Sequence, residues 1–343
     1  MKKTLKKPLI YKEWIGCRWM ILIMTFALVV IKYIPISNLL GRYKASLALD
    51  SNFVIDPYWF NNKIFDTPEN MLFLFPLILI LVVLLFKTEK QTSTCGLIMS
   101  MPFKRKDIII NKYIVGAFSI FIAFLINFLI MSVLYVGNVE FIKTSYTDIP
   151  MWYLINFLYC ILFFTFSMFM QTVMGKYLVA TFFTPIFFFI PISIVVYVSQ
   201  GLGWIFSKSL TGEKLNELIL PFNIYSVIEG SRINIGSKLY KYLYINYAMK
   251  ILYVIVIISV FIWLLIYCYK KIDMERIHSI FLFKKFQIIF NILISINVAM
   301  IISIIIVDGI GFINSNISFI VVFLIVMGIS YSLCNKIIRF ANR

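Results

Sequence analysis

Long apolar runs alternate with short polar segments along the whole chain. Each run is close to the ~20 residues that an α-helix needs to cross a bilayer, and its apolar character is continuous, unlike the alternating pattern of a membrane β-barrel strand. The runs occupy residues 17–34, 70–86, 113–136, 151–174, 177–199, 247–269, 286–307 and 317–333. The pattern predicts an all-α polytopic membrane protein with about eight transmembrane helices, and it leaves the number of C-terminal spans open.

The polar segments between the runs set the expected organisation. Residues 35–68 begin with a proline and carry charges of both signs, which predicts a polar outer loop. Residues 200–246 form the longest loop and mix aromatic with polar residues, so short re-entrant helices and an ordinary folded outer loop both fit. We expect an exporter-type transmembrane core over residues 1–270, and a basic inner loop with a C-terminal helix pair over residues 271–343.

Composition excludes an ordinary soluble domain. The chain is 62% hydrophobic and only 14% charged, against about 45–50% and about 25% for soluble proteins. Its net charge is +17, and most lysines and arginines fall in residues 1–18, 87–112, 270–285 and the C-terminal tail. Because cytoplasmic loops of membrane proteins accumulate cations, we predict that both termini are cytoplasmic. We interpret the positive charge as a result of this topology in the lipid bilayer, rather than as a sign of nucleic-acid binding.

Cations and aromatic residues are mixed ahead of the first span. Residues Tyr11, Lys12, Glu13, Trp14 and Arg18 are typical of a helix that lies in the membrane interface, with its tryptophan at headgroup depth. A plain basic flank is the alternative. No small-x-small cleavage site follows the apolar run, so we expect the first span to be retained.

Residues suited to catalysis are scarce. The chain has no G-x-x-x-x-G-K-[ST] loop for nucleotide phosphates, and its one histidine, His278, lies in a basic segment away from acidic clusters. The five cysteines form no C-x-x-C pair. The spans hold no Asp–Asp or His–Asp pair of the kind used in acid–base catalysis. We therefore predict no enzymatic activity, metal or cofactor in this chain.

Several polar residues fall within the predicted spans. They are Asn127, Asn156, Gln171, Asn291 and Asn297. We interpret them as hydrogen-bonding groups between helices, each worth about 0.6–2 kcal/mol, rather than as the lining of a pathway.

The segment between the second and third spans carries a distinctive order of residues. The adjacent cations Lys104, Arg105 and Lys106 would cost several kcal/mol in hydrocarbon, so the segment must protrude into the cytoplasm. Its informative positions are Glu89, Thr94, Ile98, Met99, Ser100, Met101, Pro102, Arg105, Lys106 and Lys112. In order and spacing they resemble the loop that contacts the ATPase in permease subunits of bacterial ATP-binding-cassette exporters of the type-two class. Ser93 and Gly96 depart from the family, which usually has a glycine and often an acidic residue there.

Two further stretches support the resemblance. The N-terminal residues 11–14 with Arg18 are similar to the family's interfacial elbow helix. The sequence Tyr269-Lys270-Lys271, with Glu275, looks like the basic stop after the sixth span in a Gram-positive subgroup that has two extra C-terminal spans.

The resemblance implies a permease subunit in a bacterial cytoplasmic membrane. A separate cytoplasmic ATPase would bind ATP and Mg²⁺ and act on the permease through residues 87–112. A second permease, of the same or a different chain, would complete the exporter.

Two other classes of function stay open at this stage. One is a membrane-embedded enzyme that acts on lipid or cell-wall intermediates, with its site in residues 200–246. The other is a sensor or immunity protein that binds a toxic peptide at the outer loops without moving it. No selectivity motif identifies a substrate, because an apolar path suits peptides, lipids and drugs alike.

Overall fold

The chain divides into two compact units. In the computed structural model the described residues are 7–50, 53–65, 72–87, 89–90, 103–205, 231–234, 240–243, 246–272, 279–306 and 316–341. The first unit comprises Met1–Met168 and Val227–Lys270, and the second comprises Phe169–Ser226 and Lys271–Arg343. The functional boundary expected at residue 270 stays a prediction.

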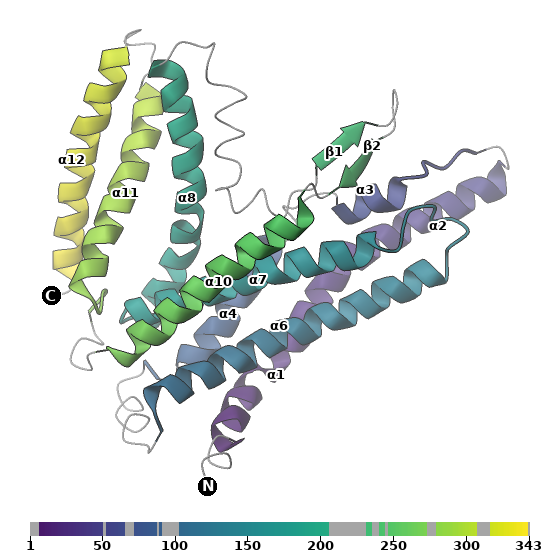
Figure 1. Cartoon of the computed structure of the whole chain (residues 1–343), viewed down its shortest axis with the longest axis horizontal. Coiled ribbons are helices and arrows are strands. Elements are labelled where there is room, and N and C mark those ends of the chain that lie inside the picture. Colours follow the sequence, from purple (N-terminus) through teal and green to yellow (C-terminus); the bar gives the residue numbers. More distant parts are fainter. Residues whose placement is uncertain are drawn as a thin grey trace. The chain divides into compact units, whose positions relative to one another are not determined.

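Helices dominate both units (Figure 1). The first unit contains α1 (Lys7–Leu28), the π-helix η2 (Val29–Tyr33), α2 (Ile34–Leu49), α3 (Trp59–Phe65), α4 (Leu74–Lys87), α6 (Arg105–Val136), β1 (Ser231–Asn234), β2 (Tyr240–Leu243) and α10 (Tyr247–Lys270). Helix α7 (Asp148–Val173) passes from the first unit into the second. The second unit adds α8 (Tyr177–Ile205), α11 (Lys284–Ile304) and α12 (Asn316–Ala341).

The all-α polytopic class predicted from the sequence is confirmed. Within the described residues, 5 helices are long and apolar enough to cross a membrane: Pro8–Leu49, Arg105–Val136, Asp148–Val173, Tyr247–Lys270 and Lys285–Ser303. Shorter apolar helices occupy Leu74–Lys87, Tyr177–Pro191 and Ile320–Lys336. Each predicted span overlaps one of these helices. The protein is therefore a multi-pass membrane protein.

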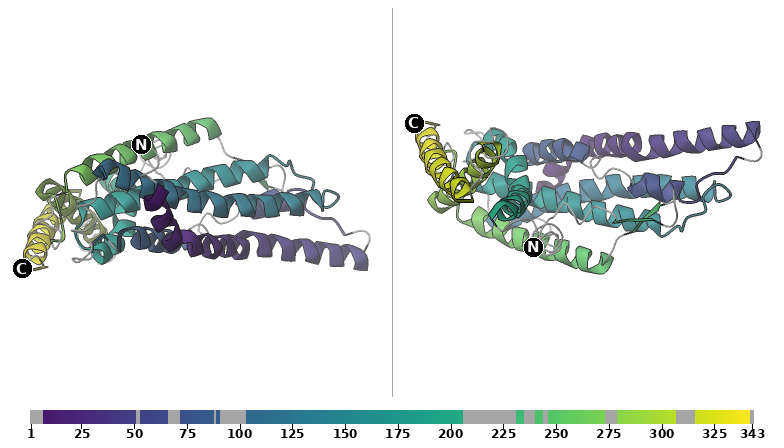
Figure 2. Two further views of the ribbon diagram at one scale, coloured as in Figure 1. Left: turned by 90° about the horizontal axis from the view of Figure 1, so that it is seen from below. Right: turned by 90° about the horizontal axis from the view of Figure 1, so that it is seen from above.

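The N-terminal helix continues well past the predicted end of the first span. Elements α1, η2 and α2 follow one another without a break from Lys7 to Leu49. Figure 2 shows the first part of α1 at an angle to the rest, which forms a long run that we call the rod. The prediction of a polar loop starting at Pro35 is wrong, because α2 and α3 occupy much of that segment. The residues expected to form an interfacial helix, 11–14 and Arg18, lie in the first part of α1, and their place at the membrane interface stays a prediction.

A proline explains the π-helix. Pro35 lies at the start of α2, where its missing N–H is not needed. Its ring would crowd the carbonyl of Ile31 in a regular α-helix. The preceding turn is widened, and the Ile34 N–H donates to the carbonyl of Val29, five residues back. The chain thus accommodates the proline without ending the helix.

Helix α1 buries a narrow stripe against α4 and α6. Its buried residues include Leu9, Cys17, Met24 and Leu28, whose spacing follows the helical repeat. The acidic residue Glu13 lies in the same stripe and is also buried.

Helix α6 approaches its neighbours closely at Gly116. A Cβ atom there would lie 2.3 Å from Phe164 Cζ on α7 and 3.1 Å from Leu85 Cδ1 on α4. A side chain would have to displace a fully buried aromatic ring. The glycine therefore lets three helices meet one turn beyond Lys112.

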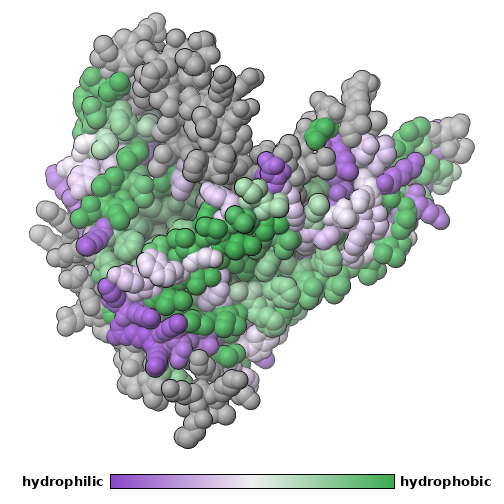
Figure 3. Space-filling view, viewed as in Figure 1, coloured by the Kyte–Doolittle hydropathy of each residue, from purple (hydrophilic) through white to green (hydrophobic). Residues whose placement is uncertain are grey.

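The first unit exposes an apolar face suited to lipid. Figure 3 shows hydrophobic residues over α6 and α10, with hydrophilic residues gathered near the N-terminal end of α6. Large exposed apolar side chains include Phe118 on α6 and Leu252 and Trp263 on α10. Lipid hydrocarbon tails are as apolar as these side chains, so their exposure to the bilayer carries no free-energy cost.

In the second unit, α8, α11 and α12 pack on one another (Figure 1). Polar groups connect them: the Asn291 amide donates to Asn335 Oδ1 at 3.1 Å, and the Ser193 hydroxyl donates to Asn297 Oδ1. At one end, the Leu282 N–H donates to the carbonyl of Val173 at 2.9 Å. Polar residues of these spans thus stabilise helix packing, as interpreted from the sequence.

Candidate functional site

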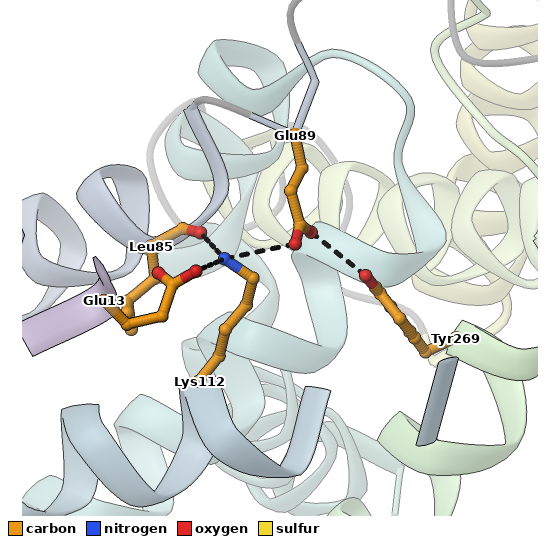
Figure 4. A network of polar contacts seen from close by, with 5 residues as sticks. All are labelled: Glu13, Leu85, Glu89, Lys112 and Tyr269. Atoms are coloured by element: carbon orange, nitrogen blue, oxygen red, sulfur yellow. Dashed lines mark hydrogen bonds and ion pairs between the residues drawn. The ribbon is translucent and has the colours of Figure 1, made fainter. Parts of the chain in front are cut away.

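A buried charge cluster lies at the base of the 87–112 segment. Its centre is Lys112, in the second turn of α6, whose side chain is 0% exposed. The ammonium nitrogen lies 2.9 Å from Glu13 Oε1 on α1 and 3.2 Å from Glu89 Oε1 just after α4. It also donates to the Leu85 carbonyl near the end of α4 (Figure 4).

The fourth contact in the cluster comes from a residue near the C-terminal end of the first unit. Tyr269, the penultimate residue of α10, donates its hydroxyl to Glu89 Oε2 at 3.0 Å. Figure 4 shows Glu89 between Lys112 and Tyr269, with one carboxylate oxygen directed at each. We call Glu13, Leu85, Glu89, Lys112 and Tyr269 the inner cluster. It joins α1, the end of α4, α6 and α10.

Local helix geometry brings these groups together. Glu13 lies four residues from Leu9 and from Cys17, so it shares their inward-facing stripe on α1. Lys112 shares the buried face of α6 with Ile108 and Val115. Glu89 is placed by the turn that ends α4, where its N–H donates to the Phe86 carbonyl at 3.1 Å.

The cluster satisfies the lysine fully. An ammonium has three N–H donors, and three oxygens surround Lys112: those of Glu13, Glu89 and Leu85. Removing one partner of such a buried ion pair typically costs about 3–5 kcal/mol, because the other charge stays buried. The geometry suits a rigid junction between helices, and it offers no group arranged to attack or protonate a substrate.

The structure places the predicted ATPase-contacting residues in different environments. Glu89 and Lys112 are buried in the inner cluster, so any effect they have on a partner must pass through the elements they hold. Arg105 is half-buried and donates from Nη1 to the Lys270 carbonyl at 3.2 Å, whereas Lys106 is exposed. The remaining members lie outside the described residues: Thr94, Ile98, Met99, Ser100, Met101 and Pro102.

The predicted interfacial residues also differ in how exposed they are. Tyr11, Lys12 and Arg18 are exposed, and Trp14 is half-buried with its ring 6.2 Å from that of Phe118. Glu13 alone is buried. Glu13 was expected at the surface with the other interfacial residues, but its position within the apolar stripe of Leu9 and Cys17 indicates that it faces inward.

A second polar junction lies at the opposite end of the first unit. Asn61 on α3 is fully buried and pairs with the backbone of Tyr242 on β2: its Oδ1 accepts from the Tyr242 N–H at 2.8 Å, and its Nδ2 donates to the Tyr242 carbonyl at 3.2 Å. The same Nδ2 donates to Asp148 Oδ2 at the start of α7, at 2.8 Å. We call Asn61, Asp148 and Tyr242 the outer latch.

The outer latch holds a small hairpin to the helices. Strands β1 and β2 pair antiparallel, with Arg232 opposite Tyr242. Asn61 acts on the edge of β2 as a neighbouring strand would, because it offers one donor and one acceptor to the same residue. Neither the hairpin nor the latch was predicted, because a single asparagine in a polar segment carries no pattern.

Lys32 provides another buried cation within the rod. Its ammonium donates to the Ile64 carbonyl on α3 at 3.0 Å and lies 4.7 Å from the centre of the Trp152 ring on α7. These contacts tie η2 to the elements that carry the outer latch.

Neither junction resembles a metal site. Within the described part of the chain, no group of three or more His, Cys, Asp or Glu residues is arranged to hold a metal ion. His278 lies outside the described residues.

Comparison with known families agrees with this architecture. The sequence model of a family described as ABC-2 family transporter protein matches residues 58–229. The chain belongs to the ABC-2 transporter family. Comparison with curated proteins finds no significant match.

Membership makes this ABC-2 protein a membrane-embedded transport component of the permease type. The matched segment runs from the start of α3 beyond the end of α8, and it includes Glu89 and Lys112. Glu13 and Tyr269 lie outside it. The inner cluster therefore joins the family segment to one element before it and one after it.

Proposed function

We propose that this ABC-2 protein is the permease subunit of an ATP-driven exporter. A separate cytoplasmic ATPase binds ATP and Mg²⁺ and contacts residues 87–112, and a second permease, of the same or a different chain, completes the translocation path. The membrane is the cytoplasmic membrane of a Gram-positive bacterium. The permease belongs to the Gram-positive subgroup whose members have two further C-terminal spans.

The observation that carries the proposal is the Glu89–Lys112 ion pair. These residues lie at the two ends of the proposed ATPase-contacting segment and are 3.2 Å apart through Glu89 Oε1 and the lysine Nζ. The segment is therefore closed at its base. A force applied to it reaches α4 and α6 together instead of separating them.

The other members of the inner cluster extend this connection. Glu13 joins α1 to the same lysine, and Tyr269 joins α10 to the same glutamate. A partner that pulls on the segment would act on four elements held at one junction. Coupling between distant sites can be carried by a packed structure of this kind, whose position both partners bias.

Exposed cations support a cytoplasmic location for this end of the first unit. They come from α1, α4, the 87–112 segment and α10, and are Lys12, Arg18, Lys87, Lys104, Lys106 and Lys270. Such a concentration is expected on the cytoplasmic side, where cations also meet lipid phosphate.

The proposal is tested by co-expressing the tagged permease with a candidate ABC ATPase from the same organism. We expect the two to co-purify and the permease to stimulate ATP hydrolysis. Met99→Glu places a charge in the proposed contact and should abolish co-purification, whereas Lys336→Gln, an exposed cation of α12 in the second unit, should leave it intact. Equal co-purification of both variants would contradict the proposal.

Sidedness gives an independent test. A cysteine introduced at the exposed Lys106 should react with a membrane-impermeant maleimide only after the cell membrane is opened. Reaction in intact cells would place this end outside and would overturn the proposed coupling.

A further inference from the structure

A groove runs between α2 and the C-terminal part of α6. It has a volume of about 630 Å³. Its lining includes Leu40, Gly41, Leu129 and Val133, with Lys44 and Asn138 toward the C-terminal ends of the two helices. Leu129 and Val133 are 54% and 73% exposed, so the groove opens toward the surroundings of the protein. Its floor is apolar and one end is cationic.

The position of Lys44 along the rod sets its depth in a membrane. At about 1.5 Å per residue, the 26 positions from Arg18 to Lys44 span about 39 Å. A bilayer is about 40–45 Å thick when its headgroup regions are included, and its hydrocarbon core is about 30 Å thick. With Arg18 among the inner headgroups, Lys44 therefore lies among the outer headgroups and the apolar floor lies at acyl-chain depth.

The ammonium of Lys44 is held across the end of the groove. It donates to Asn138 Oδ1 at 2.6 Å, and the Asn138 amide donates in turn to the Leu134 carbonyl at 2.8 Å. The ammonium also lies 5.0 Å from the centre of the Phe141 ring. These contacts orient the lysine in advance, and one N–H bonded to Asn138 leaves it able to donate to a further acceptor.

We propose that this groove binds one anionic phospholipid of the outer leaflet. Its phosphate would accept from Lys44 and one acyl chain would lie along the floor beside Gly41. Among the described residues that line the groove, none is acidic. A neutral partner helix or a second copy packed here would desolvate the ammonium without a counter-charge, which is unfavourable, whereas a phosphate supplies that charge.

Gly41 offers a direct way to block the site. A Cβ atom built there meets nothing within 4 Å. Gly41→Phe should therefore fill the groove with its ring while causing no steric clash with the fold. Lys44→Gln removes the charge and keeps the groove open, and Arg42→Gln is the matched control, because Arg42 is an exposed cation on the same helix that does not line the groove.

The experiment measures lipid binding to the full-length permease without an ATPase. Protein in detergent is titrated with phosphatidylglycerol or phosphatidylcholine, and bound lipid is counted by native mass spectrometry. We expect one phosphatidylglycerol to bind at least tenfold more tightly than phosphatidylcholine, Lys44→Gln to lose that preference, Gly41→Phe to lose the bound lipid, and Arg42→Gln to match the unmodified protein.

Several results would overturn the proposal. One is equal binding of the two lipids to the unmodified protein, which indicates ordinary surrounding lipid. Another is equal losses in Lys44→Gln and Arg42→Gln. A third is a Gly41→Phe variant that keeps its lipid but changes from dimer to monomer, which assigns the groove to a second copy. Thermal melting of each variant must match the unmodified protein for its binding result to be counted. The readout does not depend on the ATPase, so its outcome is separate from that of the proposed exporter function.

Discussion

The two ends of the first unit are closed by different chemistry. At the inner cluster a buried ammonium is shared by two carboxylates, and the contacts join residues up to 180 positions apart. At the outer latch a neutral amide pairs with a backbone segment and one carboxylate. The inner junction depends on charge, whereas the outer junction depends mainly on directional hydrogen bonds.

This difference teaches how each end should respond to change. A buried ion pair becomes costly when one partner is removed, because the remaining charge stays desolvated. When a neutral amide is removed, its former partners lose only a hydrogen bond, which costs about 1–3 kcal/mol of stability. The inner end should therefore tolerate substitution less well than the outer end.

The largest effect is expected for Lys112→Met. Without the ammonium, Glu13 and Glu89 are buried without their shared counter-charge, and we expect a loss of about 3–5 kcal/mol of stability. Thermal melting of the purified protein measures it. The triple variant Glu13→Gln, Glu89→Gln, Lys112→Met should recover most of the loss, because it removes the charges together. A triple variant less stable than Lys112→Met would show that charge is not the cause.

A smaller effect is expected for Asn61→Ala at the outer latch. The substitution removes three hydrogen bonds of the fully buried amide, and we expect a loss of about 1–3 kcal/mol and faster proteolysis of the β1–β2 hairpin. The neighbouring Asn62→Ala is the control, because its amide makes only a 3.4 Å contact with Asp56. If the two variants behave alike, the latch does not hold the hairpin.

Tyr269→Phe probes a single contact of the inner cluster. It keeps the ring and removes one hydroxyl hydrogen bond to the Glu89 carboxylate, so we expect a loss of about 1.5–3 kcal/mol, below that of Lys112→Met. Tyr253→Phe on the same helix is the control. A loss as large as that of Lys112→Met would mean that the tyrosine, rather than the lysine, dominates the junction.

The smallest effect on stability is expected for Arg105→Gln. Its hydrogen bond to the Lys270 carbonyl is exposed, and contacts of this kind contribute less than about 1 kcal/mol. If the ATPase contacts this segment, the variant should nevertheless lower ATPase stimulation several-fold. Unchanged melting with unchanged stimulation would remove Arg105 from the coupling surface.

The apolar pattern was sufficient to predict the spans. Runs of continuous apolar residues have one physical outcome in a bilayer, because each backbone polar group must be satisfied within its own helix. The continuation of the first helix through Pro35 was missed. A proline usually signals the end of a helix, whereas here a π-turn at residues 29–33 accommodates it and the helix continues.

The candidate site was predicted only in pieces. Glu13, Glu89 and Lys112 were all singled out, but their meeting is a long-range contact that no local pattern specifies. The charged Glu13 within the stripe of Leu9 and Cys17 was the available clue. Asn61 had no such clue, because its role depends on a strand more than 170 residues away, reached at Tyr242.

The unbroken helical run from Lys7 to Leu49 has a mechanical consequence. It contacts the inner cluster through Glu13 and α3 through Lys32, so a displacement of its N-terminal part is expected to reach its C-terminal end along one continuous backbone. If the proposed ATPase moves the N-terminal part, a fluorescent reporter at Leu49, which is 90% exposed at the C-terminal end of the run, should sense that movement.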